Sequence, residues 1–467
     1  MKILNKPLHE FSSHKYNRID TKYWATTDSI ENNEYVLIQN LFDVINGSVQ
    51  TTNYSNEVTS IPYIRIGDMS YKDGLDITDA MYLNDDTEIK QDKILQEDDI
   101  IVATIGATVG KTALAKEAKG GTFSNNTVVL RKKFNNIDSK FYSLLLQADY
   151  YIDYIFGVVS QKAQPNLQEY DLKNIKVPFI EYHAAKIFID DIVPIESEIN
   201  NLKSQLLPVK STIDRVISQE FELNIEALKE IDNVKIIKST LTDLSFNNSN
   251  HRFSPRWNKA GLIQEKLIGM KSVFELLGNH IISTQNGWSP ECTEASSLFQ
   301  VLGIDAINKD SHIQFNNVKF SDIYSPNFDK YIVKDNDFFV SRGNTTDLVA
   351  LASIATITDE ISDTVFPDLM IRIDFKQTIN KQYMAYIFNS FIGRLYFKYA
   401  SKGKNQTMVK ISKKELHDFY VPVPKIDIQN KIVNKIQQEI NNQNAIKAEI
   451  AQLRAQIDEI IEGAIKN

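Results

Sequence analysis

The feature that most constrains the fold lies near the middle of the chain, in residues 183–221, where apolar residues recur at alternating spacings of four and three. This is the period of the residues that face a partner helix in a coiled coil. The apolar positions are Phe188, Ile192, Ile195, Ile199, Leu202, Leu206, Val209, Ile213 and Val216. The C-terminal tail repeats the rhythm at Ile446, Ile450, Leu453, Ile457 and Ile460. The sequence therefore predicts two long helices that pair with each other.

Two prolines, Pro194 and Pro208, lie within the first of these stretches. Proline removes an intrahelical hydrogen bond, and its ring clashes with the preceding turn. Each proline is therefore expected to kink the helix or to mark the start of a new one.

The rest of the chain shows a tandem repeat. The first half contains a predicted short helix at 36–45, strands at 61–70, 98–105 and 127–130, and an aromatic helical segment at 139–156. Matching segments follow in the same order at 272–277, 299–305, 337–340, 369–375 and 383–399. An α+β domain followed by a long helix, present twice, is the economical interpretation. The predicted parts are a first domain (1–182), a first spacer helix with its linker (183–238), a second domain (239–426) and a second spacer helix (427–467).

Composition limits the class of protein. The 467 residues suffice for two or three domains, and the single cysteine, Cys292, excludes a disulfide framework and favours the reducing cytoplasm. No stretch approaches the roughly 18 apolar residues of a membrane helix, so no membrane partner is expected. The net charge of −8 opposes wholesale coating of nucleic acid but allows a local basic groove.

Two loops follow the aromatic helical segments at matching places in the two halves. They are SQKAQPN at 160–166 and SKGKNQ at 401–406. Lysine pairs with guanine and Gln or Asn with adenine in the major groove of DNA, so the loops are candidate DNA readers, with a solvated loop as the alternative. The residues are Ser160, Gln161, Lys162, Gln164 and Asn166 in the first loop, and Lys402, Lys404, Asn405 and Gln406 in the second. Further candidates for DNA contact are Asn344 and five basic residues, each of which is also compatible with an ordinary surface charge: Arg65, Lys111, Arg131, Arg342 and Arg372.

Several catalytic interpretations fail on spacing. GATVGKT at 106–112 has three residues between its glycines, whereas a phosphate-binding P-loop needs four. Asp368 and Asp374, with Lys376, suggest a metal-dependent nuclease, but residues six apart on a strand lie about 20 Å from each other. No glycine-rich cofactor turn with an Asn/Asp-Pro-Pro-aromatic loop is present, and the histidines lack metal-ligand spacing. The sequence predicts no catalytic residue, no metal site and no cofactor in this chain.

The ordered motifs resemble the specificity subunit of type I restriction-modification systems over essentially the whole chain. The resemblance rests on NRIDTKYW and SPRWNK at the domain starts, YIRIGD, DDIIVATIGATVGKTAL, QPNLQEYDLKNIKVPF and LHDFYVPVP. The chain departs from the pattern in the second domain, whose turn at 342–346 lacks Gly-Lys, and in the two spacer prolines.

This resemblance implies two target-recognition domains, each reading one half of a bipartite site in double-stranded DNA. It also implies an antiparallel coiled coil of the two spacers, which fixes the gap between half-sites and docks two modification (methyltransferase) subunits. S-adenosylmethionine, ATP and Mg²⁺ are expected on partner subunits, including a restriction/translocase subunit. The competing hypothesis is a coiled-coil interaction scaffold that binds protein partners without reading DNA.

Overall fold

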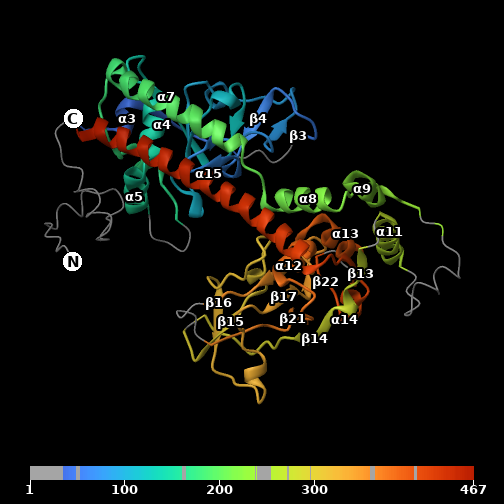
Figure 1. Ribbon diagram of the computed structural model, residues 1–467. Coiled ribbons are helices and arrows are strands. Elements are labelled where there is room, and N and C mark those ends of the chain that lie inside the picture. Colours follow the sequence, from blue (N-terminus) through green and yellow to red (C-terminus); the bar gives the residue numbers. More distant parts are fainter. Residues whose placement is uncertain are drawn as a thin grey trace. The chain divides into compact units, whose positions relative to one another are not determined.

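The computed structural model describes residues 35–48, 53–159, 165–236, 238, 254–270, 273–294, 296–357, 363–403 and 407–466 (Figure 1). The chain forms two compact units. Unit 1 comprises Met1–Gln205 and Lys447–Asn467, and unit 2 comprises Leu206–Ile446.

Unit 1 contains two four-stranded sheets. The first has the strand order β2 (Phe42–Asn46), β11 (Thr127–Lys132), β8 (Ile100–Ala103), β9 (Thr112–Leu114), and all its neighbours are antiparallel. The second has the order β10 (Thr122–Phe123), β4 (Ile61–Ile64), β7 (Met81–Leu83), β3 (Tyr54–Ser55). Two small antiparallel pairs join β1 (Tyr35–Leu37) to β12 (Lys176–Pro178) and β5 (Met69–Ser70) to β6 (Gly74–Leu75). The helices among the described residues before the C-terminal helix are α3 (Ile38–Leu41), α4 (Ser139–Gln147), α5 (Asp149–Val158), α6 (Glu169–Lys173) and α7 (Tyr182–Ser204).

Unit 2 repeats the strand order of the first sheet, and its second sheet has three strands where that of unit 1 has four. Its first sheet has the order β14 (Ile281–Asn286), β21 (Met370–Phe375), β17 (Phe338–Ser341), β19 (Ala352–Ile354), and its second has the order β16 (Val318–Ser321), β15 (Phe299–Leu302), β20 (Thr364–Val365). Small pairs join β13 (Phe274–Leu276) to β23 (Tyr420–Pro422) and β18 (Gly343–Asn344) to β22 (Val409–Lys410). The helices are α8 (Val209–Glu220), α9 (Ile225–Asn233), α11 (Pro255–Met270), α12 (Lys381–Asn389), α13 (Phe391–Ala400) and α14 (Lys413–His417). The predicted tandem α+β repeat is confirmed.

The central strand of each first sheet is buried on both faces, as its unbroken apolar run predicts. In β8, Ile100 and Val102 join the core beneath α4 and α5, whereas Ile101 joins the core of the smaller second sheet. In β17, Phe338 and Val340 face the helices and Phe339 faces the other way. Each unit therefore has a helical core on one side of its first sheet and a smaller core on the other.

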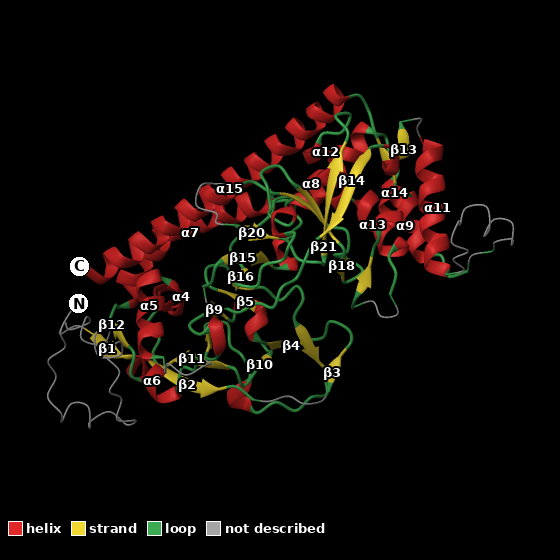
Figure 2. Ribbon diagram, turned by 90° about the horizontal axis from the view of Figure 1, so that it is seen from below, coloured by secondary structure: helices red, strands yellow, loops and turns green. Residues whose placement is uncertain are grey.

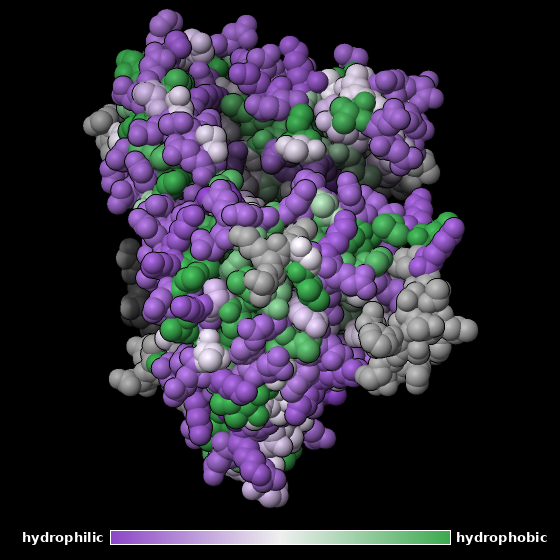
Figure 3. All heavy atoms as spheres, turned by 45° about the vertical axis from the view of Figure 1, so that its right-hand side comes forward, coloured by the Kyte–Doolittle hydropathy of each residue, from purple (hydrophilic) through white to green (hydrophobic). Residues whose placement is uncertain are grey.

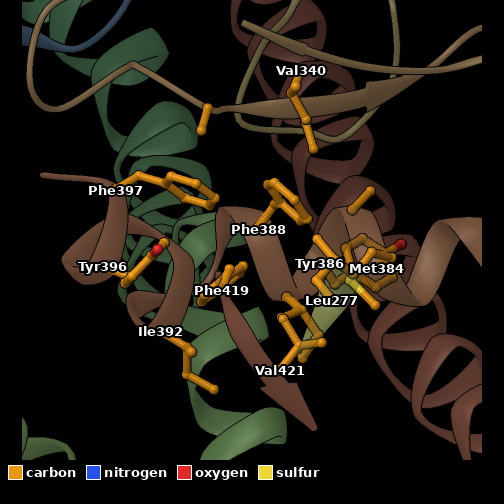
Figure 4. Close-up of a cluster of buried hydrophobic side chains, with 14 of the residues drawn as sticks. Leu277, Val340, Met384, Tyr386, Phe388, Ile392, Tyr396, Phe397, Phe419 and Val421 are labelled. Atoms are coloured by element: carbon orange, nitrogen blue, oxygen red, sulfur yellow. The ribbon is translucent and has the colours of Figure 1, made fainter. Parts of the chain in front are cut away.

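An aromatic cluster holds the helical core of unit 2 together (Figure 4). The rings of Tyr396 on α13 and Phe419 after α14 stack with centroids 4.7 Å apart. Phe388 on α12 meets Phe419 edge to face at 5.6 Å. These contacts explain why the residues 383–399 are so rich in aromatic side chains, since offset and edge-on ring pairs add stability beyond the area they bury.

The spacer helices pair in an antiparallel sense within each unit. In unit 1, Ile192 of α7 shares a core with Ile461 of α15 (Ile426–Lys466), while Ile199 lines the same cavity as Ile457 (Figure 2). In unit 2, Arg215 of α8 forms an ion pair with Glu439 of α15. The predicted positions Ile192, Ile199, Leu202 and Ile450 are buried, and Ile195, Leu206, Ile446, Leu453 and Ile457 are half-buried.

The predicted restart of the first spacer is confirmed at Pro208, because the chain leaves the helix after Ser204 and α8 begins at Val209, whereas Pro194 remains inside α7. Two short predicted helices are corrected by the structure. Residues 36–45 are not one short helix but β1, the single turn α3 and β2, and residues 272–277 lead into β13 rather than a helix. Pairing with β12, β11 and β23, which lie far away in sequence, overrides the helical spacing in these short segments.

The surface in view in Figure 3 is mostly hydrophilic, with apolar residues in small separate areas. Over the described residues, no helix is both long enough and apolar enough to cross a membrane.

Candidate nucleic-acid interface

In unit 1, the turn after the central strand lies against the segment that follows the helical pair α4–α5. The amide of Gly106 donates to the carbonyl of Pro165 at 2.8 Å, and Ile105 forms a β-bridge with Asn166. Leu167 also donates to Thr104 at 2.8 Å. GATVGKT and the end of SQKAQPN, which the sequence presents as separate candidates, are therefore neighbours.

The same junction recurs in unit 2. Gly343 and Asn344 of β18 pair with Lys410 and Val409 of β22, and the amide of Ile411 donates to the carbonyl of Arg342 at 2.9 Å. The turn after the central strand again meets the segment after the helical pair, here α12–α13. We call these two places the reading junctions of units 1 and 2.

Lys402 anchors the second loop. Its backbone exchanges hydrogen bonds with Lys410, and its ammonium group lies 2.6 Å from the carboxylate of Glu415, whose side chain is 1% exposed. Ser412 donates to the same carboxylate at 2.5 Å. Burial alone would raise the pKa of Glu415, but the bonds from Lys402 and Ser412 lower it, so the carboxylate stays ionised. Lys402 is thereby fixed, whereas the side chain of Lys410 is exposed.

The two turns are braced by their own charged residues. Lys111 donates to the carbonyl of Met69 at 3.1 Å and lies 5.7 Å from the centre of the Tyr71 ring. Arg342, 30% exposed, donates to the carbonyl of Asp368 at 3.2 Å. The side chain of Asn344 accepts from the amide of Thr345 at 2.8 Å, which leaves its amide nitrogen as a donor.

Arg131 of β11 and Arg372 of β21 each pair with an aspartate that precedes the central strand. The two arginines do so from different places on their strands, because Arg131 follows Leu130, which pairs with Ile100, whereas Arg372 pairs with Phe339. Arg131 makes a two-pronged pair with Asp99, at 2.9 and 2.6 Å, and donates to the carbonyl of Ile94 at 2.7 Å. Arg372 bonds Asp337 at 3.0 Å. The hydrogen bond with Asp99 raises the pKa of Arg131, and all four side chains are largely buried. Both guanidinium groups are thus occupied within the fold.

Sequence reasoning missed this clamp, although a signal existed. Asp99 and Asp337 stand at the same place before the two apolar strand runs, and each is followed by an arginine on the neighbouring strand of the sheet. The strand registers place the two arginines two residues apart, so the shared signal is the aspartate. Arg65, by contrast, makes a partly exposed pair with Asp68 at 3.3 Å.

Some predicted readers lie outside the described residues. These are Ser160, Gln161, Lys162, Gln164, Lys404, Asn405 and Gln406.

The carboxylates that suggested a nuclease are separately engaged. Ser289 donates to Asp368 at 2.7 Å, and Ser283 donates to Asp374 at 2.5 Å. Within the described part of the chain, no group of three or more His, Cys, Asp or Glu side chains is placed to hold a metal ion.

Comparison with known proteins gives a family match over most of the chain. The family model described as "Type I restriction modification DNA specificity domain" matches residues 30–181 and 270–454, once in each half. No curated protein sequence matches the chain.

Solved structures resemble the chain at low identity. The S subunit of a type I restriction-modification system from M. genitalium is 15% identical, with 93% of this chain and 97% of that chain covered and a TM-score of 0.39. A structure concerning complex assembly and conformational transition of the type I R-M system is 14% identical, with 92% and 96% covered and a TM-score of 0.43. The HsdS subunit from Thermoanaerobacter tengcongensis is 14% identical, with 92% and 95% covered and a TM-score of 0.30.

Proposed function

Because the chain belongs to the type I restriction-modification DNA specificity family, we propose that its two domains read the two halves of one bipartite DNA site. A specificity subunit is the non-catalytic, DNA-recognising part of a type I complex. We assign the readers to residues 1–182 and 239–426, joined by the spacer helices.

The observation that carries the proposal is the pair of reading junctions. Each unit brings a turn and a loop together at the end of a strand that is buried on both faces, so the backbone that presents the side chains is rigid. Side chains held on such a scaffold can discriminate bases, because a good two-pronged contact to a base edge contributes roughly 1–3 kcal/mol.

The side chains at the junctions have suitable chemistry. In unit 2, Asn344 offers an amide and Lys410 an exposed ammonium group from adjacent strands, β18 and β22. In unit 1, Asn166 stands beside the Gly106 turn. Amides pair with adenine, and lysine pairs with guanine acceptors or with phosphate. The two junctions differ in residue type, as two readers of different half-sites require.

The partners follow from the same proposal. Two methyltransferase subunits would dock on the paired spacer helices, and these partners would hold S-adenosylmethionine and modify adenine. A further restriction/translocase subunit would supply ATP and Mg²⁺ for cleavage. The working place of the complex would be the cytoplasm, where its DNA substrate lies.

The test is to co-express the chain with the methyltransferase encoded beside it and to map methylated adenines. The wild type should yield a bipartite motif with a fixed gap. The Asn344→Ala and Lys410→Ala double variant should lower methylation at the wild-type motif by about tenfold or more. The sequence preference should relax at one half-site only, while the other half-site keeps its preference. Lys319→Ala, which removes an exposed lysine from β16, is the matched control.

Two results would contradict the proposal. Equal loss of preference at both half-sites would refute two separate readers. A chain that binds partners yet never retains duplex DNA would favour the interaction scaffold instead.

A further inference from the structure

A small hairpin in unit 1 touches both the reading junction and the spacer helices. It consists of β5, β6 and the turn between them, residues 69–75, and we call it the β5–β6 hairpin. Its base is packed into the fold: Met69 is buried, at 3% exposure, in the smaller core of unit 1, and Leu75 packs against that core. Movement at its tip is therefore resisted by a packed base.

On one side, the hairpin holds the turn of the reading junction. The hydroxyl of Tyr71 lies 3.0 Å from the carbonyl oxygens of both Ala107 and Val109. Lys111 reaches back to donate to the carbonyl of Met69 and sits over the Tyr71 ring. Burial raises the pKa of Tyr71, so the hydroxyl keeps the proton that it donates.

On the other side, the tip of the hairpin holds both spacer helices. The carboxylate of Asp73 pairs with Lys203 of α7 at 2.6 Å and with Arg454 of α15. Lys72 pairs with Asp458 of α15 at 2.8 Å. Although burial would raise the pKa of Asp73, its two cationic partners lower it, so the carboxylate is charged at neutral pH.

In unit 2, the ion pair of Arg215 with Glu439 joins α15 to α8, and α12 and the residues next to it hold α15 with uncharged groups. The side-chain amide of Gln429 donates to the carbonyl of Thr378 at 2.8 Å, and Asn380 donates to Asn430 at 2.8 Å. Tyr386 donates to Gln437 at 3.2 Å. The charged link through the turn of a hairpin is thus a feature of unit 1.

We propose that the β5–β6 hairpin is a positioning element: it sets the orientation of the turn in the unit 1 reading junction, residues 106–112, relative to the spacer helices of unit 1. Through this link, Asp73 and Tyr71 control how strictly the complex keeps one gap between the two half-sites. The proposal rests on the function proposed above, because a gap exists only if two half-sites are read. A purely structural hairpin would affect stability and leave the gap unchanged.

The test compares four variants in the complex with the methyltransferase subunits, using methylation mapped on sites whose gap is varied by one base pair. Asp73→Asn removes the charge, Tyr71→Phe removes the hydrogen bonds, and Asp73→Glu restores a carboxylate. Lys186→Ala is the matched control, because it breaks an ion pair with Asp190 that lies within α7 alone. Melting temperatures and circular dichroism establish that each variant is folded.

Asp73→Asn and Tyr71→Phe should raise methylation at sites whose gap differs from that of the wild-type motif. The expected rise is about two- to fivefold relative to the wild-type gap, because the loss of a partly exposed ion pair changes an equilibrium by roughly this factor. Asp73→Glu and Lys186→Ala should keep the wild-type profile. Folded Asp73→Asn with a wild-type gap profile would overturn the inference while leaving the bipartite motif, and hence the proposed function, intact.

Hydrogen exchange on the free chain tests the hairpin inference independently of the proposed function. The amides of Val109 and Gly110, which bond Gly106 and Ala103, should exchange faster in Asp73→Asn than in Lys186→Ala. Absence of a bipartite motif in the wild type would end the proposed function. Unchanged exchange at Val109 and Gly110 would independently end the coupling between Asp73 and the reading turn.

Discussion

Replacing Arg131 by Met separates a structural role for this arginine from a role in DNA binding. Methionine keeps an unbranched apolar side chain but removes the guanidinium group, which pairs with Asp99 and donates to Ile94. The side chains of Arg131 and Asp99 are only 16% and 2% exposed, so solvent cannot replace the lost bonds.

The expected cost is about 3 kcal/mol. Removing one partner of a buried pair costs roughly 3–5 kcal/mol, because the remaining charge is left unpaired. The lower end applies, since Asp99 keeps a hydrogen bond from the amide of Gln96 at 2.8 Å. For a domain of this size, the melting temperature should fall by about 6–12 °C.

Scanning calorimetry that resolves the unfolding of the two units is the assay, with two matched controls. Arg65→Met removes a partly exposed pair with Asp68 and should cost less than about 1 kcal/mol. The double variant Asp99→Leu, Arg131→Met removes both charges and should recover most of the loss. If Arg131→Met left the melting of unit 1 unchanged and weakened DNA binding instead, the clamp reasoning would be refuted.

Two further predictions concern the scaffold of the reading junctions. The pKa of Glu415 is lower in the folded state than in the unfolded chain, so its carboxylate stabilises unit 2 above its unfolded pKa of about 4.3. This stabilisation is lost as the pH falls through the folded-state pKa. Urea titrations should therefore show that Glu415→Gln is less stable than the wild type at pH 7 and nearly equal to it at the acid limit. An added Cβ at Gly47 would lie 1.8 Å from the carbonyl oxygen of Ser124, and one at Gly287 would lie 2.1 Å from that of Pro367. Gly47→Ala and Gly287→Ala should therefore each destabilise only their own unit, by about 1–3 kcal/mol. Calorimetry should show this as a shift of one unfolding transition.

The sequence predicts elements whose signal is local. The run of four apolar residues at 100–103 defines β8, and the four-three spacing defines the faces of α7 and α15 that are buried. Residues 36–45 have a helical spacing as well, yet most of them belong to two strands because the partner strands β11 and β12 lie about 80 to 140 positions further on. Long-range pairing of this kind leaves no trace in a short window.

The contacts of the candidate site were harder to predict for the same reason. The sequence predicts a loop at Asn166 and a turn at Gly106, but neither segment contains a signal that predicts the contact between them. The sequence does not predict the contacts of Asp73, because its partners Lys203 and Arg454 lie far apart in the chain and only the fold brings them together.

Comparing the two halves of the chain offers a way to separate scaffold from readout. Two domains that read different half-sites need the same framework and different base contacts. The Asn–Gly step at 46–47 and 286–287 occurs in both halves, as does an aspartate before the central strand that pairs with an arginine of the neighbouring strand. Both features support the central sheets. The junction segments differ, with Lys111 and Asn166 in one half and Arg342, Asn344 and Lys410 in the other. Under the proposed function, residues shared by the halves stabilise the fold, and the specificity of the chain is expected among those that differ.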